Sequence, residues 1–480
     1  MVADAMTGLS GLTPSRMTSG TSIRRLLCLP CWLMAAPLGT AAAGAAGTTA
    51  VSANDFLNSI GVCVHVQHGQ DASKLVAPLK YLGVRNVRDG ADQNYDMSGL
   101  ITLHQQAGVR VAFGPGSGAS DRFLDRRSGR TNNALTATIA AARQLAQAGA
   151  LLAVEGPNEP NNFGGVTYQG QTSGVTNGTW MPVAKFQRDL YRAVKSDAVL
   201  KRYPVFGASE MGAETDDVGL QFLTIPPGAN CLMPNGTRYA DYANVHNYVC
   251  GHIKGLVDNQ AFQAASPANV PGFDGLFANH GNTWRKHFAG YPESRLAALP
   301  KVTTETGWWT DNTISGDDIQ GKVFLNVFLD QCKAGWKHTF IYEMMDDPDG
   351  SCGFYKSDYA TARKSADYLH NLTTILADAG SLPTPGELNY SISGQPATVH
   401  DLLLQKSNGA FELAVWGEEA KGTNRVTVNL GGTCASVKIY DPTIDVSPVQ
   451  TLSNASSVPL ALSDHPVIIE IAARRTLRTG

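Results

Sequence analysis

The sequence lacks an uninterrupted apolar segment of the ~20 residues that a membrane-spanning helix needs. Its apolar run at residues 26–38 is short and contains Pro30 and Pro37. Basic residues are not in surplus either, since 38 Lys and Arg stand against 41 Asp and Glu. A nucleic-acid-binding chain would need such a surplus, at least on one face. We therefore expect no membrane span in the mature chain and no nucleic-acid partner.

Two kinds of cofactor motif are also missing. No Gly-x-Gly-x-x-Gly follows the first predicted strand, which argues against a dinucleotide-binding fold. Beyond residue 53 no Cys-x-x-Cys and no Cys/His cluster has zinc-binding spacing. The sequence thus predicts neither an organic cofactor nor a metal.

The first 53 residues have the order of a secretory signal. Arg24 and Arg25 precede the apolar run, small residues follow, and Val51–Ala53 offers a cleavage site. A twin-arginine export route and a membrane anchor are the alternatives, and the prolines disfavour the anchor. We expect a protein that is secreted or periplasmic.

Six cysteines remain after this leader, and an exported protein permits disulfides. The nearest neighbours are Cys231 with Cys250 and Cys332 with Cys352, and we predict these two pairs. Buried free thiols are the alternative reading, especially for the two cysteines outside these pairs.

Residues 54–379 alternate short apolar runs with amphipathic stretches that end at glycine or proline. This pattern predicts parallel strands separated by helices, and eight strands close a (β/α)8 barrel. A doubly wound open sheet is the alternative. The predicted strands are residues 60–66, 84–88, 109–113, 151–155, 204–209, 242–248, 301–305 and 338–342.

Helical periodicity stops near residue 380. Short alternating segments separated by Gly, Asn and Pro turns follow, at residues 399–405, 411–416, 425–430, 436–440 and 467–471. We predict that residues 380–480 form an antiparallel β-sandwich.

Two glutamates follow predicted barrel strands. Glu159 lies in Asn158-Glu159-Pro160 after the fourth strand, and Glu305 ends the seventh strand in front of Trp308 and Trp309. Barrel enzymes carry their chemistry at the carboxyl ends of strands. Two carboxyl groups facing one mouth are what glycoside hydrolysis requires.

These motifs resemble the retaining glycoside hydrolases of clan A, and the barrel-plus-sandwich layout is most similar to family 39, with families 5 and 30 as neighbours. The resemblance covers the barrel. It implies that Glu159 is the acid/base and Glu305 the nucleophile, without metal or organic cofactor. It further implies that Arg88 braces the nucleophile and that His246 or, preferably, Tyr248 contacts it.

The remaining candidates are expected to bind sugar. Asn158 offers an amide to a hydroxyl group, Tyr342 stands where the clan commonly has an aromatic floor, and His65 ends the first strand. Of Trp308 and Trp309, we expect only one to face the sugar. His246 has a competing interpretation as a core histidine.

The resulting prediction is a secreted, monomeric hydrolase that cleaves a β-linked oligosaccharide or polysaccharide by double displacement. Retention predicts carboxyl groups ~5–5.5 Å apart and a raised pKa for Glu159, which must start protonated. A transglycosylase with the same glutamates and a non-catalytic polysaccharide-binding barrel are the alternatives.

Overall fold

The computed structural model describes residues 47–472, except 127, 164, 212–230, 235, 249–299, 311–315, 349 and 420–421. Most of the predicted leader therefore lies outside the described residues. Within the described part, no helix is both long and apolar enough to cross a membrane.

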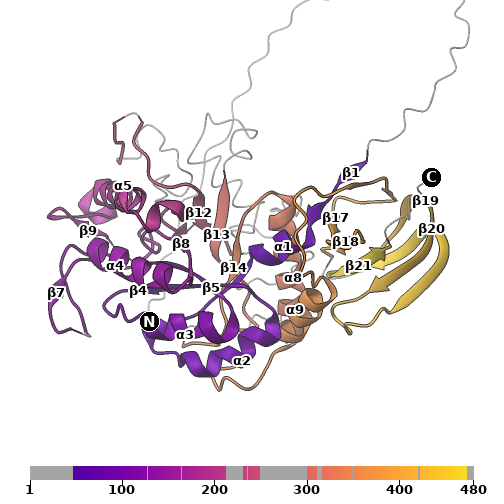
Figure 1. Cartoon of the computed structure of the whole chain (residues 1–480), viewed down its shortest axis with the longest axis horizontal. Coiled ribbons are helices and arrows are strands. Elements are labelled where there is room, and N and C mark those ends of the chain that lie inside the picture. Colours follow the sequence, from indigo (N-terminus) through magenta and orange to yellow (C-terminus); the bar gives the residue numbers. More distant parts are fainter. Residues whose placement is uncertain are drawn as a thin grey trace, which may run out of the picture. The chain divides into compact units, whose positions relative to one another are not determined.

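Eight parallel strands form the first part of the fold (Figure 1). Hydrogen-bonded pairing runs in the order β11-β12-β13-β14-β3-β4-β5-β8. Isolated parallel bridges from Val154 to Val205 and from Asn158 to Ser209 then join β8 to the segment that leads into β11. The ring is thereby closed. Its strands are β3 (Ile60–Cys63), β4 (Asn86–Ala91), β5 (Arg110–Pro115), β8 (Leu151–Val154), β11 (Glu210–Met211), β12 (Ala243–His246), β13 (Lys301–Thr306) and β14 (Thr339–Ile341).

Helices alternate with these strands, and their ends follow the expected local chemistry. Asp71 caps the first turn of α2 by accepting from the amide of Ser73, and Gly83 ends that helix at φ 68°. Gly108 ends α3 in the same way at φ 75°. The helices are α1 (Ala53–Ser59), α2 (Ala72–Leu82), α3 (Ser98–Ala107), α4 (Ala134–Gln147), α5 (Met181–Ser196), α8 (Asp317–Lys333) and α9 (Lys364–Ile375).

The interior of the barrel is packed rather than open. Phe206 and Phe340 are fully buried there, together with small residues such as Ala112 and Ala153. A Cβ atom on Gly61 would lie 2.4 Å from the ring of Phe340, so this glycine makes room for the phenylalanine. A filled interior confines any binding site to the ends of the barrel.

The C-terminal part is a seven-stranded, mostly antiparallel sheet, continuous through β16-β19-β21-β18-β17-β2 with β20 paired to β19. The long strands β19 and β20 curve visibly (Figure 1). Apolar residues from several strands form its own core, including Leu413, Val428 and Ile469. Its strands are β16 (Ser391–Ser393), β17 (Val399–Gln405), β18 (Phe411–Gly417), β19 (Asn424–Tyr440), β20 (Gln450–Leu462) and β21 (Pro466–Ile471).

The segment before the barrel also belongs to this sheet. Strand β2 (Val51–Ser52) pairs in parallel with β17, and β1 (Thr48–Thr49) pairs with β15 (Glu387–Leu388). Ser52 then caps helix α1. The sequence assigned these residues to the leader, whereas the structure pairs them with the C-terminal part.

Helix α8 joins the barrel to the sheet through a buried contact. The indole Nε1 of Trp416 donates to Asp330 Oδ1 at 2.9 Å, and Asn326 donates to the carbonyl of Gly417 at 3.1 Å. Leu402 and Ile468 of the sheet share one apolar core with the barrel helices. The two parts are therefore packed together, not merely linked.

The predicted disulfide between Cys332 and Cys352 is wrong, because both residues are free thiols. Cys332 lies in the last turn of α8, whereas Cys352 follows β14 at the opposite end of the barrel. A helix of this length separates its ends by roughly 25 Å, far beyond the ~4.4–6.8 Å between Cα atoms that a disulfide spans. Cys250, the predicted partner of Cys231, lies outside the described residues.

Candidate active site

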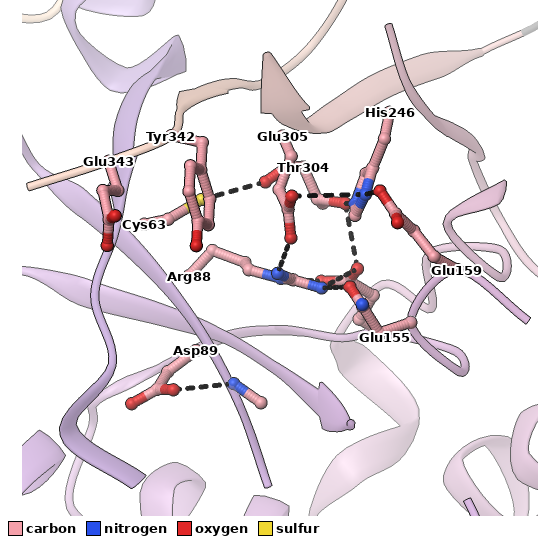
Figure 2. Close-up of polar contacts among 12 residues, drawn as sticks. Cys63, Arg88, Asp89, Glu155, Glu159, His246, Thr304, Glu305, Tyr342 and Glu343 are labelled. Atoms are coloured by element: carbon pink, nitrogen blue, oxygen red, sulfur yellow. Dashed lines mark hydrogen bonds and ion pairs between the residues drawn. The ribbon is translucent and has the colours of Figure 1, made fainter. Parts of the chain in front are cut away.

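The carboxyl ends of the barrel strands surround a cavity of about 550 Å³. Among the predicted residues, Arg88, Asn158, Glu159, His246, Tyr248, Glu305, Trp309, Tyr342 and His65 all line it. Figure 2 shows the central group, in which Glu305 and Glu159 lie on either side of His246 and above Arg88 and Glu155. The residues come from six strands that are distant in sequence and adjacent in the closed ring.

Glu305 is held on two sides. Its Oε1 forms a close ion pair with Arg88 Nη1, and its Oε2 accepts from the hydroxyl of Tyr248 at 2.8 Å. Glu305 is only 7% exposed. The predicted contacts of Glu305 with Arg88 and Tyr248 are thus both present.

Arg88 links three further acceptors to the same network. Its Nε and Nη2 each lie 3.1 Å from one oxygen of Glu155, and Nη2 also donates to Asn158 Oδ1 at 2.6 Å. This fork geometry fixes the guanidinium plane. Glu155 is fully buried. The positive charge of Arg88 is therefore balanced by two carboxylates, those of Glu155 and Glu305.

The backbone at Glu159 is unusual. Its φ of 37° lies in the left-handed region, which a non-glycine residue adopts at a cost of about 1–3 kcal/mol. The amide of Glu159 donates to the carbonyl of Ser209 at 2.8 Å, which holds this conformation. Strain of this kind is concentrated at functional sites, where it aims a side chain.

The carboxyl group of Glu159 is also held by two partners. Its Oε1 lies 2.6 Å from His246 Nδ1, and its Oε2 accepts from Asn162 at 2.8 Å. His246 Nδ1 lies 3.5 Å from Glu305 Oε2 as well. The resemblance implied that His246 or Tyr248 would contact the nucleophile. The structure gives the short contact of His246 to the other glutamate.

These contacts overturn the expected pKa of Glu159. Burial raises the pKa, but the hydrogen bond and charge of His246, the hydrogen bond of Asn162 and the charge of Arg88 outweigh burial. The pKa of Glu159 therefore lies below its usual value in the free protein. Sequence reasoning missed this because it counted the neighbouring carboxylate and not the histidine.

His246 is oriented through its second nitrogen. Its Nε2 lies 3.0 Å from the hydroxyl of Thr304, which in turn lies within hydrogen-bond distance of Glu155 and Asn244. His246 is 1% exposed. A buried network with this many partners fixes the plane of the imidazole ring. The competing interpretation of a core histidine is right about its burial, but the ring faces the cavity.

Aromatic side chains form the walls. Trp309 and Tyr342 both line the cavity and pack against Tyr248, with ring centroids 5.1 and 6.3 Å away. The assignment of Trp308 to sugar binding is wrong. Trp308 is 0% exposed and belongs to the apolar core between strands and helices. Of the two tryptophans, only Trp309 reaches the cavity.

Much of the remaining cavity lining is polar, and most of these residues were missed from the sequence. His65, Asp89, Asp92 and Asp347 belong to it. Burial lowers the pKa of His65 to about 4 and raises that of Asp89 to about 7. Burial also raises the pKa of the adjacent Glu343 to about 10.

Two residues in the loop that follows Glu159 were also not predicted from the sequence. Asn162 holds its carboxylate, and Phe163 lines the cavity with 64% of its surface exposed. The available signal was the Gly-, Asn- and Thr-rich loop that begins at residue 161. Such a loop identifies a region but not a particular side chain.

Replacing Tyr248 by Phe should lower kcat about 10- to 100-fold. A hydrogen bond to a charged group contributes about 1.5–3 kcal/mol, and its loss frees Glu305 to rotate. Steady-state kinetics on the best substrate measures the effect. Tyr81→Phe is the control, because Tyr81 makes a 2.8 Å hydrogen bond to Asp367 away from the cavity. An unchanged kcat in Tyr248→Phe would contradict a role for this contact.

Comparison with known proteins finds similarity in solved structures. No family profile matches the chain, and no curated protein matches it. Solved structures do. A family 39 glycoside hydrolase from Bacteroides cellulosilyticus WH2 has 16% identity over 87% of this chain and 82% of its own, with a TM-score of 0.53.

Two others are similar to the same extent. A family 30 subfamily 8 xylanase from Clostridium acetobutylicum has 13% identity, covering 89% of this chain and 97% of its own, with a TM-score of 0.51. A GH51 arabinofuranosidase from Xanthomonas axonopodis pv. citri has 12% identity over 89% and 97%, with a TM-score of 0.53. The chain thus shares the fold of these glycoside hydrolases.

Proposed function

We propose that this protein is a retaining glycoside hydrolase that cleaves a β-linked glycan. The observation that carries the proposal is the carboxylate pair itself. An oxygen of Glu159, an oxygen of Glu305 and a ring nitrogen of His246 all lie within 4.8 Å of one another beside an open cavity. Retaining enzymes keep their two carboxyl groups ~5–5.5 Å apart, whereas inverting enzymes separate them by ~6.5–9.5 Å to admit a water.

In the first step Glu305 is the nucleophile. Its oxygen forms a bond to the anomeric carbon while the glycosidic bond breaks, and Glu159, in the protonated form that acidic pH favours, gives its proton to the departing oxygen. Arg88 and Tyr248 hold the attacking carboxylate in one orientation. The product is a glycosyl ester on Glu305 and a free leaving group.

In the second step Glu159, now a carboxylate, takes a proton from water. The water oxygen bonds to the anomeric carbon, the ester bond breaks and Glu305 is regenerated. His246 and Asn162 stabilise the charged form of Glu159 that this step requires. Two inversions at the same carbon return the original configuration.

Export is part of the proposal. The order of Arg24 and Arg25, an apolar run and small residues supports a secretory leader. Secretion suits an enzyme whose substrate is an extracellular polysaccharide. Detection of the chain in the culture supernatant or periplasm, rather than in the cytoplasm, tests this point.

The function itself is tested by incubating the protein with xylan, β-glucans and aryl β-glycosides and following the anomeric configuration of the first product by NMR. We expect β-product at early times. Release of α-product would show that the mechanism is inverting and not retaining. Transfer of sugar to a sugar acceptor would indicate a transglycosylase. Equal turnover by Glu159→Gln and the unmodified protein would refute the site.

Replacing His246 by Phe should move the alkaline limb of the kcat/KM profile to higher pH by about one unit or more. That limb reports loss of the proton from the free enzyme's acid. Burial raises the pKa of Glu159, and removal of the imidazole takes away the hydrogen bond and the charge of His246, which lower it.

A pH–rate profile from pH 3 to 9 measures the shift. His370→Phe is the matched control, since His370 stacks on Tyr81 outside the cavity. A limb that stays in place or moves to lower pH in His246→Phe would show that His246 does not set the pKa of Glu159.

A further inference from the structure

Three potential metal ligands meet on the cavity wall away from Glu159. His65 follows strand β3, and Glu343 and Asp347 follow strand β14. One ligand atom from each lies within 4.8 Å of the other two. His65 and Asp347 line the cavity, and Figure 2 shows Glu343 beside Tyr342, on the far side of Glu305 from Glu159.

Glu343 forms a hydrogen bond with Asp347 when it is protonated, and in its charged form one of its oxygens accepts no hydrogen bond. The residue is 0% exposed, and its Oε2 is a buried oxygen that accepts no hydrogen bond within the described part of the chain. A buried, unsatisfied carboxyl oxygen is costly, and it calls for a ligand or a specific reason. The nearest ring nitrogen, His65 Nε2, is 3.7 Å away, too far for a hydrogen bond.

One further oxygen of Glu343 and one oxygen of Asp347 are held by neighbours. Cys352 Sγ donates to Glu343 Oε1 at 3.5 Å, and the hydroxyl of Tyr342 donates to Asp347 Oδ2 at 2.7 Å. Supporting hydrogen bonds of this kind orient the ligands of a metal ion. Glu343 Oε2 lies 3.7 Å from His65 Nε2, within the cluster of three ligand atoms.

The size of the gap distinguishes a metal ion from an ammonium group. Two ligands ~2.1 Å from a tetrahedral metal are roughly 3.4 Å apart, whereas two acceptors about 2.8 Å from an ammonium nitrogen are roughly 4.6 Å apart. The observed 3.7 Å between His65 Nε2 and Glu343 Oε2 is close to the first value. We propose that His65, Glu343 and Asp347 bind a divalent transition-metal cation of the Zn²⁺ class.

The donor set favours this class over Ca²⁺ or Mg²⁺. One imidazole nitrogen and two carboxylate oxygens suit Zn²⁺ and its neighbours, whereas Ca²⁺ takes 6–8 oxygen ligands. Three protein ligands leave a coordination position open. Because His65 and Asp347 line the cavity, a sugar hydroxyl or a water can occupy that position.

The catalytic trio is a poorer site for a cation. Glu159, His246 and Glu305 also converge, but each carboxyl oxygen there already has a partner in His246, Asn162, Arg88 or Tyr248. The guanidinium of Arg88, in contact with Glu305, repels a second cation. The proposed site is therefore separate from the two glutamates that cleave the sugar, although it shares their cavity.

Calorimetric titration of the full chain with Zn²⁺, after removal of metals by chelator, tests the site without requiring turnover. We expect one Zn²⁺ per chain and at least about tenfold weaker binding in Glu343→Gln and in Asp347→Asn. Asp347 is less buried than Glu343. If Glu343→Gln fails to fold, Asp347→Asn therefore still tests the site.

Asp92→Asn and Glu159→Gln are the matched controls, since both remove a carboxylate from the same cavity outside the proposed ligand set. Unchanged Zn²⁺ binding in these two supports the assignment. No binding by the unmodified protein, equal binding by all variants, or a loss confined to Glu159→Gln would each overturn it. A hydrolase that fails to bind Zn²⁺ refutes only this site, and a chain that binds Zn²⁺ without cleaving glycans refutes only the proposed function.

Discussion

Glu305→Ala is expected to lower kcat/KM by at least about 10⁴-fold, the largest effect of any single substitution in the protein. Without the carboxylate no glycosyl ester forms, and the remaining groups only bind and orient the sugar. Steady-state kinetics with an activated aryl β-glycoside measures the loss. Residual activity within about tenfold of the unmodified protein would remove Glu305 from the nucleophile role.

Azide separates the roles of the two glutamates. In Glu305→Ala the small anion can attack the anomeric carbon directly from the vacated side, so the expected product is the α-glycosyl azide. In Glu159→Ala the ester on Glu305 still forms with an activated leaving group, and azide then displaces it to give the β-glycosyl azide. The opposite assignment of products would exchange the two roles.

Arg88→Met should both destabilise the protein and abolish most of its activity. The substitution leaves Glu155 buried with no cation and frees Glu305, and removal of one partner from a buried ion pair costs about 3–5 kcal/mol. Urea unfolding monitored by circular dichroism measures the stability. Arg85→Met is the control, because Arg85 bonds the side chains of Asn54 and Asn58 and no carboxylate there loses its partner.

A second substitution separates the effect of Arg88→Met on stability from its effect on activity. Adding Glu155→Gln to Arg88→Met removes the unpaired charge, so stability should partly return while activity stays low. If the double variant is less stable than Arg88→Met alone, the buried charge on Glu155 is not the source of the loss.

The strand pattern of the barrel was readable from the sequence because each strand is an apolar run bounded by glycine, proline or a helix cap. Each of the eight predicted strands corresponds to a strand or a bridge of the observed ring. In the C-terminal part, β20 (Gln450–Leu462) was missed. Most of its side chains are exposed, so it carries no alternation of apolar and polar residues.

The site was predictable to the extent that it follows strand ends. Glu159, Glu305 and Arg88 are fixed by strand number, and they meet in the closed ring. The partners of Glu159 depend on loop conformation, as Asn162 shows, and on which way a side chain turns. The sequence could therefore place the two carboxylates but not the local balance of charge that sets their pKa values.

The pairing of β2 with β17 has a consequence for synthesis of the chain. Residues 51–52 leave the ribosome early, but Leu404 and Gln405, to which they pair, are made some 350 residues later. Native contacts of such large sequence separation form slowly. The first barrel helix is anchored to this strand through Ser52, so it cannot reach its final environment cotranslationally until the C-terminal sheet has emerged. Helix α1 therefore completes its packing only late in the synthesis of the chain, after residues 404–405 have been made.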